Sequence, residues 1–451
     1  MEKKLFGTDG IRGKINTSPF TKEALSLIAK YTASILNKVY DTKKVVVGQD
    51  TRESGCWISE VICKEFLKFG YDIYDVEVFP TAGIAFLCRD LKALGVVISA
   101  SHNPYNFNGI KFLSPTGEKL PTKLEDEIEE YIKNKSKIAG SSKKGSLLKY
   151  NKEAENKYID FLKNIFLKDI DFKNNQKLKN LALVIDAANG STYKIVQKIF
   201  NELFNNVEFI NINPNGKNIN DKCGAVFPES LKKNTSVGKI GIAFDGDGDR
   251  VIFVDEKNNI RDGDYILGIL ADHYKKKKIL KNSLIVVTLM SNLGLLKYLW
   301  AKNIKVIQCP VGDKYVSEYL KKYKGNLGGE QSGHIVLYDY LPTGDGILTS
   351  LEVLKLVINS KKSLFSLCNI FEKYPQIIKN VEVSKKPPID EIFTQDFIKN
   401  LEHKIKGRIV LRYSGTEPLF RIMIEGKNKS QIEKTAKLIE DKFLKFLKNY
   451  K

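Results

Sequence analysis

Cysteine and histidine are scarce in this chain of 451 residues, which contains six cysteines and four histidines. The cysteines lie far apart with no Cys-x-x-Cys pair, so neither a disulfide framework nor metal-ligand spacing is supported, and reduced thiols are expected. The histidines are spread over the whole chain, which also argues against a zinc site. No apolar run approaches the ~18 residues that a membrane-spanning helix requires, and the start, MEKKLFGTDG, has no hydrophobic signal-peptide region. We therefore expect a cytoplasmic protein without a membrane partner.

Arginine is scarce as well, although the chain is strongly basic. The net charge is +20, but only eight of the 73 Lys and Arg residues are arginine, and the lysines are diffuse. Such a distribution is typical of a solvated surface that attracts an anionic small substrate, and it does not favour a nucleic-acid partner. Four arginines lie in the loops described below, which suggests bidentate recognition of phosphate or carboxylate: Arg12, Arg250, Arg412 and Arg421.

A strand–helix–strand unit with a glycine-bearing turn occurs three times at similar length, which predicts parallel sheet structure and internal duplication. The segment after residue 370 does not repeat this unit, and it predicts two strands and a lysine-rich amphipathic helix. The predicted strand pairs of the three units are 45–50 with 73–79, 181–186 with 207–212, and 284–288 with 304–310.

These patterns predict four domains, as expected for a chain too long for one core. Residues 1–152 form an α/β domain with a serine loop, and residues 153–252 form an α/β domain that ends in an aspartate-rich loop. Residues 253–370 form a third α/β domain with a glycine-rich polar loop, and residues 371–451 form a smaller α+β domain. Residues 134–156, rich in Lys, Ser, Gly and Asn, are expected to be a linker.

The serine loop lies in the segment Ile98–Lys111, which reads ISASHNPYNFNGIK and follows an apolar run that predicts a buried strand. The SHNP turn cannot continue the strand, so Ser101 is expected in a loop directly after it. A hydroxyl that is fixed by a strand and left open by a loop is well placed for covalent chemistry. Taken alone, the same residues also fit an ordinary polar turn.

The aspartate-rich loop, Asp245–Arg250, reads DGDGDR between two predicted strands. Three carboxylates packed this closely repel one another unless a cation joins them, and all-oxygen ligation suits Mg²⁺. An EF-hand calcium loop is the alternative, because Glu256 stands at its twelfth position. Arg250 in place of the glycine at position six, and flanking strands in place of helices, disfavour that alternative.

Three further segments carry groups suited to a phosphorylated, polyhydroxylated ligand. Residues 328–334, GGEQSGH, offer a carboxylate, a hydroxyl and an imidazole. Residues 412–418, RYSGTEP, combine with Arg421 into a phosphate cradle of guanidinium groups, hydroxyls and turn amides. Residues 6–13, FGTDGIRG, predict a tight loop that can approach a ligand. A serine nucleophile, a divalent metal and a phosphate cradle together indicate phosphoryl transfer.

In this order and spacing, ISASHNPYNFNGIK, DGDGDR, GGEQSGH and RYSGTEP resemble the motifs of the α-D-phosphohexomutases over essentially the whole chain. The resemblance implies an α/β protein with four domains around a central cleft: three similar α/β domains with mixed sheets and a smaller α+β C-terminal domain. FGTDGIRG, Gln331 and the segments 220–224 and 311–315 are similar to the branch of the family that acts on glucosamine phosphates.

The resemblance also implies a role for each motif residue. Ser101 would be carried as a phosphoserine, and Arg250 would orient it. Lys111 would be the general acid or base, or else only an electrostatic support, with help from Arg12, His102 and His334. One Mg²⁺ would be held by an oxygen of the phosphoserine at Ser101 and by Asp245, Asp247 and Asp249. The sugar hydroxyls would be bound by Glu330 and Ser332, and the phosphate that is not reacting by Arg412, Ser414, Gly415, Thr416 and Arg421.

The reaction implied is the interconversion of glucosamine 6-phosphate and glucosamine 1-phosphate through a 1,6-bisphosphate intermediate, with glucosamine or glucose 1,6-bisphosphate as activator. The product would feed UDP-N-acetylglucosamine and cell-wall precursor synthesis. The alternatives are a mutase for mannose or glucose phosphates, which shares the catalytic parts, and a metal-dependent phosphatase, which would release inorganic phosphate. The expected partner is a small phosphosugar, and the chain is expected to be a monomer or a homodimer.

Overall fold

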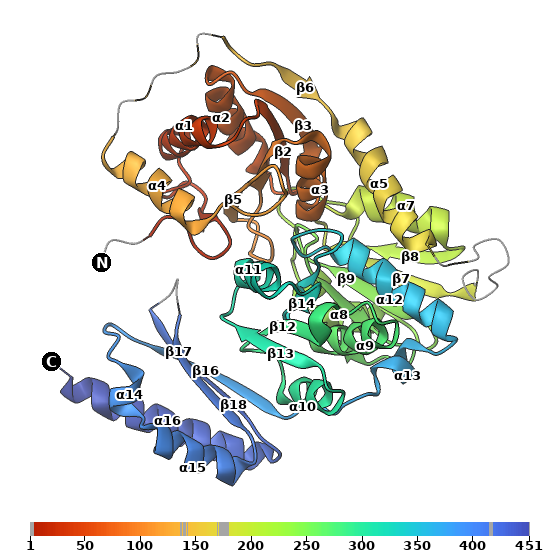
Figure 1. The fold of residues 1–451 in the computed structure, drawn as a ribbon, viewed down its shortest axis with the longest axis vertical. Helices are drawn as coiled ribbons and strands as arrows, with labels where there is room; N and C mark the ends of the chain where they lie inside the picture. Colours follow the sequence, from red (N-terminus) through yellow and green to blue (C-terminus); the bar gives the residue numbers. More distant parts are fainter. Residues whose placement is uncertain are drawn as a thin grey trace.

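The computed structural model describes residues 4–135, 138, 141, 143–168, 170, 180–414 and 418–450, the side chain of residue 449 excepted. Within these residues the chain forms four sheets that follow one another along the sequence (Figure 1). The first three are mixed sheets covered by helices, and the fourth is a three-stranded antiparallel sheet. The predicted fold class, three α/β domains and a smaller α+β domain, is therefore confirmed.

The first sheet has the strand order β1-β5-β4-β2-β3-β6, in which β4, β2, β3 and β6 are parallel and β5 is antiparallel to both of its neighbours. Helices α1, α2 and α4 pack on one face, and α3 and α5 pack on the other. Because β4 is covered on both faces, it is an unbroken run without polar side chains, LGVVI. The strands are β1 (Ile11–Lys14), β2 (Lys44–Gln49), β3 (Asp72–Val78), β4 (Leu94–Ile98), β5 (Phe107–Leu113) and β6 (Leu147–Lys149); the helices are α1 (Lys22–Val39), α2 (Gly55–Lys68), α3 (Thr81–Leu91) and α4 (Thr122–Lys133).

The second sheet has the order β11-β10-β9-β7-β8, with a parallel centre and an antiparallel edge. Its aspartate-rich loop connects β9 to the antiparallel β10, so the loop is a tight turn at one end of buried strands. The strands are β7 (Ala182–Asp186), β8 (Asn206–Ile210), β9 (Ile240–Phe244), β10 (Val251–Val254) and β11 (Ile260–Arg261); the helices are α5 (Asn151–Leu167), α7 (Tyr193–Leu203), the 3₁₀ turn η1 (Gly224–Val226) and α8 (Pro228–Asn234).

The third sheet has the order β13-β12-β14-β15, in which only β15 is antiparallel to its neighbour. Helix α12 contacts α5 and the second sheet on one side and β15 and α9 on the other, and most of its side chains are buried. Twelve of its fifteen residues are buried, so apolar side chains occur on more than one face of the helix. The elements are β12 (Leu284–Thr288), β13 (Lys305–Cys309), β14 (Leu327–Gly329), β15 (Ile335–Leu337), α9 (Gly263–Lys276), η2 (Lys281–Ser283), α10 (Leu293–Ala301), α11 (Asp313–Tyr323), α12 (Gly346–Ser360) and α13 (Leu364–Cys368).

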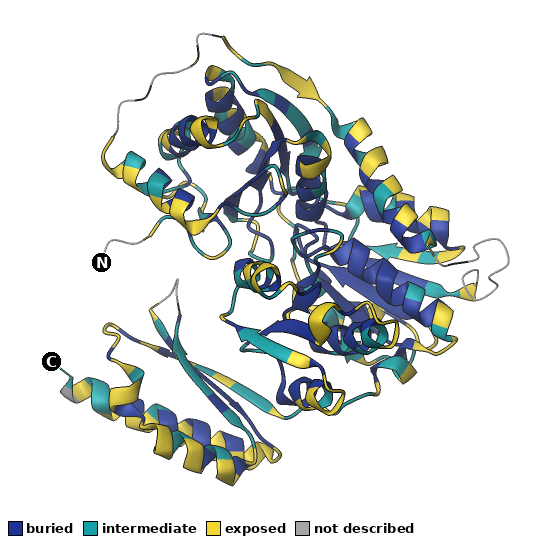
Figure 2. Ribbon diagram, in the orientation of Figure 1, coloured by how far each residue is buried: buried dark blue, intermediate teal, exposed yellow. Residues whose placement is uncertain are grey.

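The C-terminal sheet, β16-β18-β17, is covered by helices on one face (Figure 1). It contacts the third domain, because Arg408 donates to the carbonyl of Ser291 and Glu425 accepts the N–H of Leu293. It has its own apolar cluster, in which the rings of Phe420 and Phe443 stack with centroids 3.9 Å apart. Figure 2 shows buried residues along the sheets and exposed residues on the outer helix faces. The elements are β16 (Gln376–Glu382), β17 (Arg408–Tyr413), β18 (Leu419–Glu425), α14 (Ile389–Ile392), α15 (Gln395–Ile405) and α16 (Lys429–Asn449).

The fold corrects one sequence-based expectation and excludes one alternative that the sequence already disfavoured. Residues 134–156 do not form a linker throughout, because β6 and the start of α5 lie within them. Glu256 is not a calcium ligand of an EF-hand: the aspartate-rich loop lies between strands, and the Glu256 carboxylate accepts the backbone N–H groups of Leu364 and Phe365 at the start of α13. Among the helices described, none is both long and apolar enough to cross a membrane.

Candidate active site

Ser101 lies three residues beyond the end of β4, in the predicted loop, and is 1% exposed. Its backbone has φ of +50°, a left-handed conformation that is uncommon for a residue other than glycine. The Ser101 Oγ donates a hydrogen bond to Oδ2 of Asp245 at 2.6 Å. The serine loop of the first domain and the aspartate-rich loop of the second are therefore in direct contact, as the resemblance to the family implies.

The three aspartates of the DGDGDR loop are buried, and one oxygen from each lies within 4.8 Å of the others. In the described part of the chain, Oδ1 of Asp247 and Oδ1 of Asp249 are buried without a hydrogen-bond partner. A buried carboxylate oxygen without a donor is costly unless a cation satisfies it. The residues present thus fit a hard divalent cation, which prefers oxygen ligands.

Lys111 projects from β5 into this acidic cluster and is 1% exposed. Its Nζ lies 2.9 Å from Oδ2 of Asp247, 3.1 Å from Oδ2 of Asp9 and 3.7 Å from Oδ2 of Asp249. Burial disfavours the ammonium, but the charges of Asp247 and Asp9 outweigh it and raise the pKa of Lys111 well above its usual value. Lys111 is therefore charged at neutral pH.

Asp245 and Asp249 differ in proton affinity because the balance of charges around them differs. Burial and the charges of Asp249 and Asp247 raise the pKa of Asp245 well above its usual range. For Asp249, burial acts in the same direction, but Lys111 and His334 outweigh it and lower the pKa. Without a bound cation, the ionised form of Asp245 is thus destabilised by the neighbouring carboxylates.

Two histidines beside the cluster have pKa values that are shifted in opposite directions. His334 is buried, accepts the backbone N–H of Gly344 at Nε2, and has Nδ1 3.6 Å from Oδ2 of Asp249. Burial opposes the imidazolium, but Asp249 raises the pKa of His334 above its usual value. Burial, followed by the charges of Arg250 and Arg12, lowers the pKa of His102 to about 3. His102 is therefore neutral.

Arg12 and Arg250 are close to the same loops. Arg12 donates from Nη1 to Oδ1 of Asn103 at 2.9 Å and forms an ion pair with Asp9. Arg250 has Nε 3.9 Å from Oδ1 of Asp249, and its backbone pairs with that of His334. Both guanidinium groups line a cleft of about 470 Å³ next to the serine loop.

All four domains contribute side chains to this cleft, which confirms the predicted central cleft. From the third domain, Glu330 accepts the N–H of Gly312 at 3.2 Å and a hydrogen bond from Ser332 Oγ at 3.3 Å. From the C-terminal domain, Arg421 reaches it. The predicted residues that line the cleft are Arg12, His102, Asp249, Arg250, Glu330, Ser332, His334 and Arg421.

Arg412 lies outside this cleft and lines an adjoining cavity of about 130 Å³ together with Arg421. The two arginines face each other across the β17–β18 ladder, and burial together with the Arg421 charge lowers the pKa of Arg412. Like charges placed opposite each other destabilise a sheet unless an anion lies between them. Ser414 is buried at the end of β17, and Gly415 and Thr416 lie outside the described residues.

Four segments of the chain match family models, which cover nearly all of it. They are described as the phosphoglucomutase/phosphomannomutase α/β/α domains I (residues 3–139), II (156–259) and III (262–374) and the C-terminal domain (379–442). The phosphoglucosamine mutase of Chlamydia abortus is 41% identical over 449 residues, 97% of this chain and 96% of its own length. That of Campylobacter curvus is 40% identical over 451 residues, 98% of this chain and 99% of its own.

The chain belongs to the phosphoglucosamine mutase family. It is accordingly a phosphohexomutase, an isomerase that works by phosphoryl transfer. A phosphoglucomutase/phosphomannomutase family protein from Burkholderia thailandensis has the same fold with a TM-score of 0.77 at 20% identity, covering 99% of this chain and 97% of its own. The N-acetylphosphoglucosamine mutase of Aspergillus fumigatus, in complex with GlcNAc-6P and magnesium, gives a TM-score of 0.66 at 18% identity, covering 98% and 96%.

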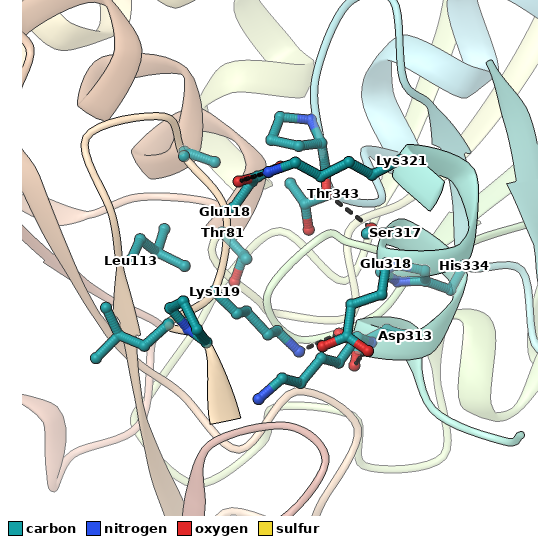
Figure 3. A pocket seen from close by; sticks show the side chains of 16 residues that line it. Thr81, Leu113, Glu118, Lys119, Asp313, Ser317, Glu318, Lys321, His334 and Thr343 are labelled. Atoms are coloured by element: carbon teal, nitrogen blue, oxygen red, sulfur yellow. Dashed lines mark hydrogen bonds and ion pairs between the residues drawn. The ribbon is translucent and has the colours of Figure 1, made fainter. Parts of the chain in front are cut away.

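Sequence reasoning missed several charged residues of this mutase site. Asp9 pairs with Lys111, Arg12 and Lys119, and Lys119 also pairs with Asp313 of the third domain. Figure 3 shows Lys119 pointing toward Asp313 at a second cavity of about 170 Å³ between the first domain and α11. Asp9 and Asp313 stand within motifs that the sequence drew attention to, but neither motif indicates that the two meet at one lysine.

Proposed function

We propose that this phosphohexomutase interconverts glucosamine 6-phosphate and glucosamine 1-phosphate, with Ser101 as the phosphoryl carrier. The observation that carries the proposal is the contact between Ser101 Oγ and Asp245 inside a cluster of three buried carboxylates beside a cleft rich in cations. The substrate is supported by relatives at 40–41% identity over nearly the full chain, which are phosphoglucosamine mutases. The remaining expectation, a product used for UDP-N-acetylglucosamine and cell-wall precursors, follows from that substrate.

In the proposed reaction, the O–P bond of a phosphoserine at Ser101 breaks as the free hydroxyl of the sugar phosphate forms a new O–P bond. The 1,6-bisphosphate then reverses its orientation in the cleft, and Ser101 Oγ accepts the phosphoryl group from the other end of the sugar. Lys111 is held as an ammonium among carboxylates, so it supplies positive charge, and it can donate a proton and take one back. His102 lines the cleft as a neutral imidazole of low basicity. Lys111 would therefore give a proton to the departing Ser101 oxygen and regain one from the attacking hydroxyl.

The metal that fits this site is Mg²⁺, which would be held by an oxygen on Ser101 and by carboxylate oxygens of Asp245, Asp247 and Asp249. When bound, the ion would withdraw charge from the phosphoryl group and make the serine a better leaving group. The supporting observations are the converging oxygens, two of them without a hydrogen-bond donor within the described residues. A 1,6-bisphosphate of glucosamine or glucose would serve as activator, because it can phosphorylate Ser101.

Substrate contacts are proposed from the lining of the cleft. Glu330 and Ser332 are hydrogen-bonded to each other and would exchange that bond for sugar hydroxyls. Arg250 and Arg12, with His334, would surround the reacting phosphoryl group. The phosphate that is not reacting would lie between the two facing arginines of the C-terminal sheet, with help from the following loop: Arg412 and Arg421, then Ser414, Gly415 and Thr416. We keep the division into domains 1–152, 153–252, 253–370 and 371–451 as part of this proposal.

A turnover assay on matched sugar 6-phosphates tests the proposal. Glucosamine, glucose and mannose 6-phosphates are supplied in turn with Mg²⁺ and a trace of the 1,6-bisphosphate, with Ser101→Ala as control. We expect a strong preference for glucosamine 6-phosphate and a loss of at least about a thousand-fold in the control. Better turnover of the mannose or glucose compound would overturn the substrate assignment, and release of inorganic phosphate without isomerisation would overturn the mutase reaction.

A further inference from the structure

The backbone carbonyl oxygens of Ser101 and Asn103 accept hydrogen bonds from the same two side chains, those of Arg52 and Asn220. Nη2 of Arg52, from the loop after β2, donates to both oxygens, at 3.2 Å in the case of Ser101. Nδ2 of Asn220, from the second domain, also donates to both, at 2.8 Å to Ser101 and 3.4 Å to Asn103. The two carbonyls are thus held from two domains at once.

Arg52 is also connected to the backbone N–H of Ser101, through Asp50 and Ser99. It forms a fully buried ion pair with Asp50, whose Oδ2 accepts the hydroxyl of Ser99. The Ser99 Oγ in turn accepts the backbone N–H of Ser101 at 2.9 Å. Both the N–H and the C=O of Ser101 are therefore tied to one buried guanidinium–carboxylate pair. Arginine suits this position because one planar fork can donate to a carboxylate and to carbonyls together.

The Ser101 backbone needs such support, because its φ of +50° is disfavoured for a residue with a Cβ. A strained conformation persists only where the surroundings over-determine it. The second domain adds to this constraint through the backbone of Gly246, where a Cβ would lie 2.6 Å from the Ser101 oxygen and 2.8 Å from Nδ2 of Asn220. Only glycine allows this close approach of the aspartate-rich loop.

We propose that Arg52 and Asn220 are positioning residues that clamp the serine loop and thereby aim Ser101 Oγ at Asp245 and the cleft. This inference rests on the proposed function of Ser101 as phosphoryl carrier and adds to it the groups that orient the carrier. Within the described chain, the side chains that line the substrate cleft do not include either residue, so the clamp acts through the backbone of the serine loop. Because Asn220 belongs to the second domain, the serine is aimed only while the first two domains are docked.

The test is the kinetics of Asn220→Ala, with Asp221→Ala as matched control at the exposed neighbouring position. A serine displaced by a fraction of an ångström reacts more slowly but leaves the substrate contacts unchanged. We expect kcat for glucosamine 6-phosphate to fall about 10- to 100-fold in Asn220→Ala, with KM within about twofold of wild type. The control should keep the wild-type kcat. A kcat within about twofold of wild type, or a KM that rises as much as kcat falls, would overturn the clamp.

Arg52→Lys provides a second arm, because lysine keeps the charge but cannot donate in a fork to Asp50 and both carbonyls. We expect kcat to fall in Arg52→Lys, and the combined variant to lose less than the product of the two single losses, because both act on the same loop. Independent, multiplicative losses would argue against a shared clamp. Arg52 is fully buried and its variant can lower the yield of folded protein, so the Asn220→Ala result decides.

The proposed function and the clamp fail in different ways. If wild type shows no isomerisation that depends on Ser101, the proposed function is wrong and the clamp loses its basis. If wild type isomerises glucosamine 6-phosphate, Ser101→Ala does not, and Asn220→Ala behaves as wild type, the clamp alone is wrong.

Discussion

The hydroxyl of Ser101 donates to Oδ2 of Asp245 at 2.6 Å, although the two residues are 144 positions apart in the chain. This contact joins the first domain to the second at a point where three carboxylates are buried together. Burial and two neighbouring carboxylates raise the pKa of Asp245, so the structure without a cation pays for this arrangement in stability. A cation bound by these carboxylates would remove that cost, so metal binding would raise the stability of the protein.

Asp245→Asn should therefore stabilise the metal-free protein while weakening metal binding. The amide oxygen can accept the backbone N–H of Arg250 while the NH2 group donates to Ser101 Oγ, and one buried charge is removed, for a gain of about 1 kcal/mol in EDTA. Asp247→Asn is the contrasting variant, because it removes the carboxylate next to Lys111 and should lower stability. Thermal unfolding in EDTA and in Mg²⁺ measures both effects. Equal destabilisation by the two variants would contradict this account.

Lys111→Met should be strongly destabilising in the absence of a divalent cation. Lys111 lies within 4 Å of three carboxylates, and removing one partner of a buried ionic cluster typically costs about 3–5 kcal/mol. Mg²⁺ should recover more stability in this variant than in wild type, because the acidic cluster then lacks its cation. Denaturant unfolding with and without Mg²⁺ checks this, with Lys119→Met, at the neighbouring ion pair with Asp313, as control. The same gain from Mg²⁺ in both variants would refute it.

Arg421→Lys should raise KM with little change in kcat. Arg421 lines both the main cleft and the adjoining cavity that it shares with Arg412, and a lysine keeps the charge but loses bidentate phosphate binding. A group that holds the non-reacting phosphate equally in the ground and transition states contributes to KM alone, and we expect a rise of about tenfold. Steady-state kinetics measures it, beside Lys399→Ala at an exposed position on α15. An unchanged KM would remove Arg421 from the phosphate site.

Asp345 should make stability depend on pH between about 4 and 6. Its carboxylate caps α12 through the N–H of Leu348 and accepts the hydroxyl of Tyr158, while burial raises its pKa to about 6. Because the folded state holds the proton more tightly than the unfolded state, the free energy of unfolding falls as pH rises through this window.

Asp345→Asn should flatten this dependence, because the amide does not titrate: its oxygen can accept the N–H of Leu348, and its NH2 group can donate to the hydroxyl oxygen of Tyr158. Urea unfolding at several pH values compares it with wild type and with Asp339→Asn, a partly exposed carboxylate paired with Lys281. A slope between about pH 4 and 6 that Asp345→Asn leaves unchanged would show that other groups carry the dependence.

The serine and aspartate loops were predictable because each follows a strand that the sequence marks clearly. Ser101 follows the apolar run of β4, and the DGDGDR loop separates two runs that became β9 and β10. Strand ends are local features, since alternation and turn residues specify them within about ten positions. The organisation into four domains was predicted from the same patterns and from the resemblance to the family.

The sequence alone thus determined the fold class, the serine and aspartate loops and the family to which the chain belongs. Only the tertiary structure decided that Lys111 stands between Asp9 and Asp247, that Lys119 joins Asp9 to Asp313, and that Arg52 and Asn220 meet behind Ser101. The physical reason is that these partners are far apart along the chain. Charge pairs and hydrogen bonds between domains depend on how the sheets dock, and local sequence periodicity does not predict that docking. Their strength depends in turn on burial, which is a property of the assembled core.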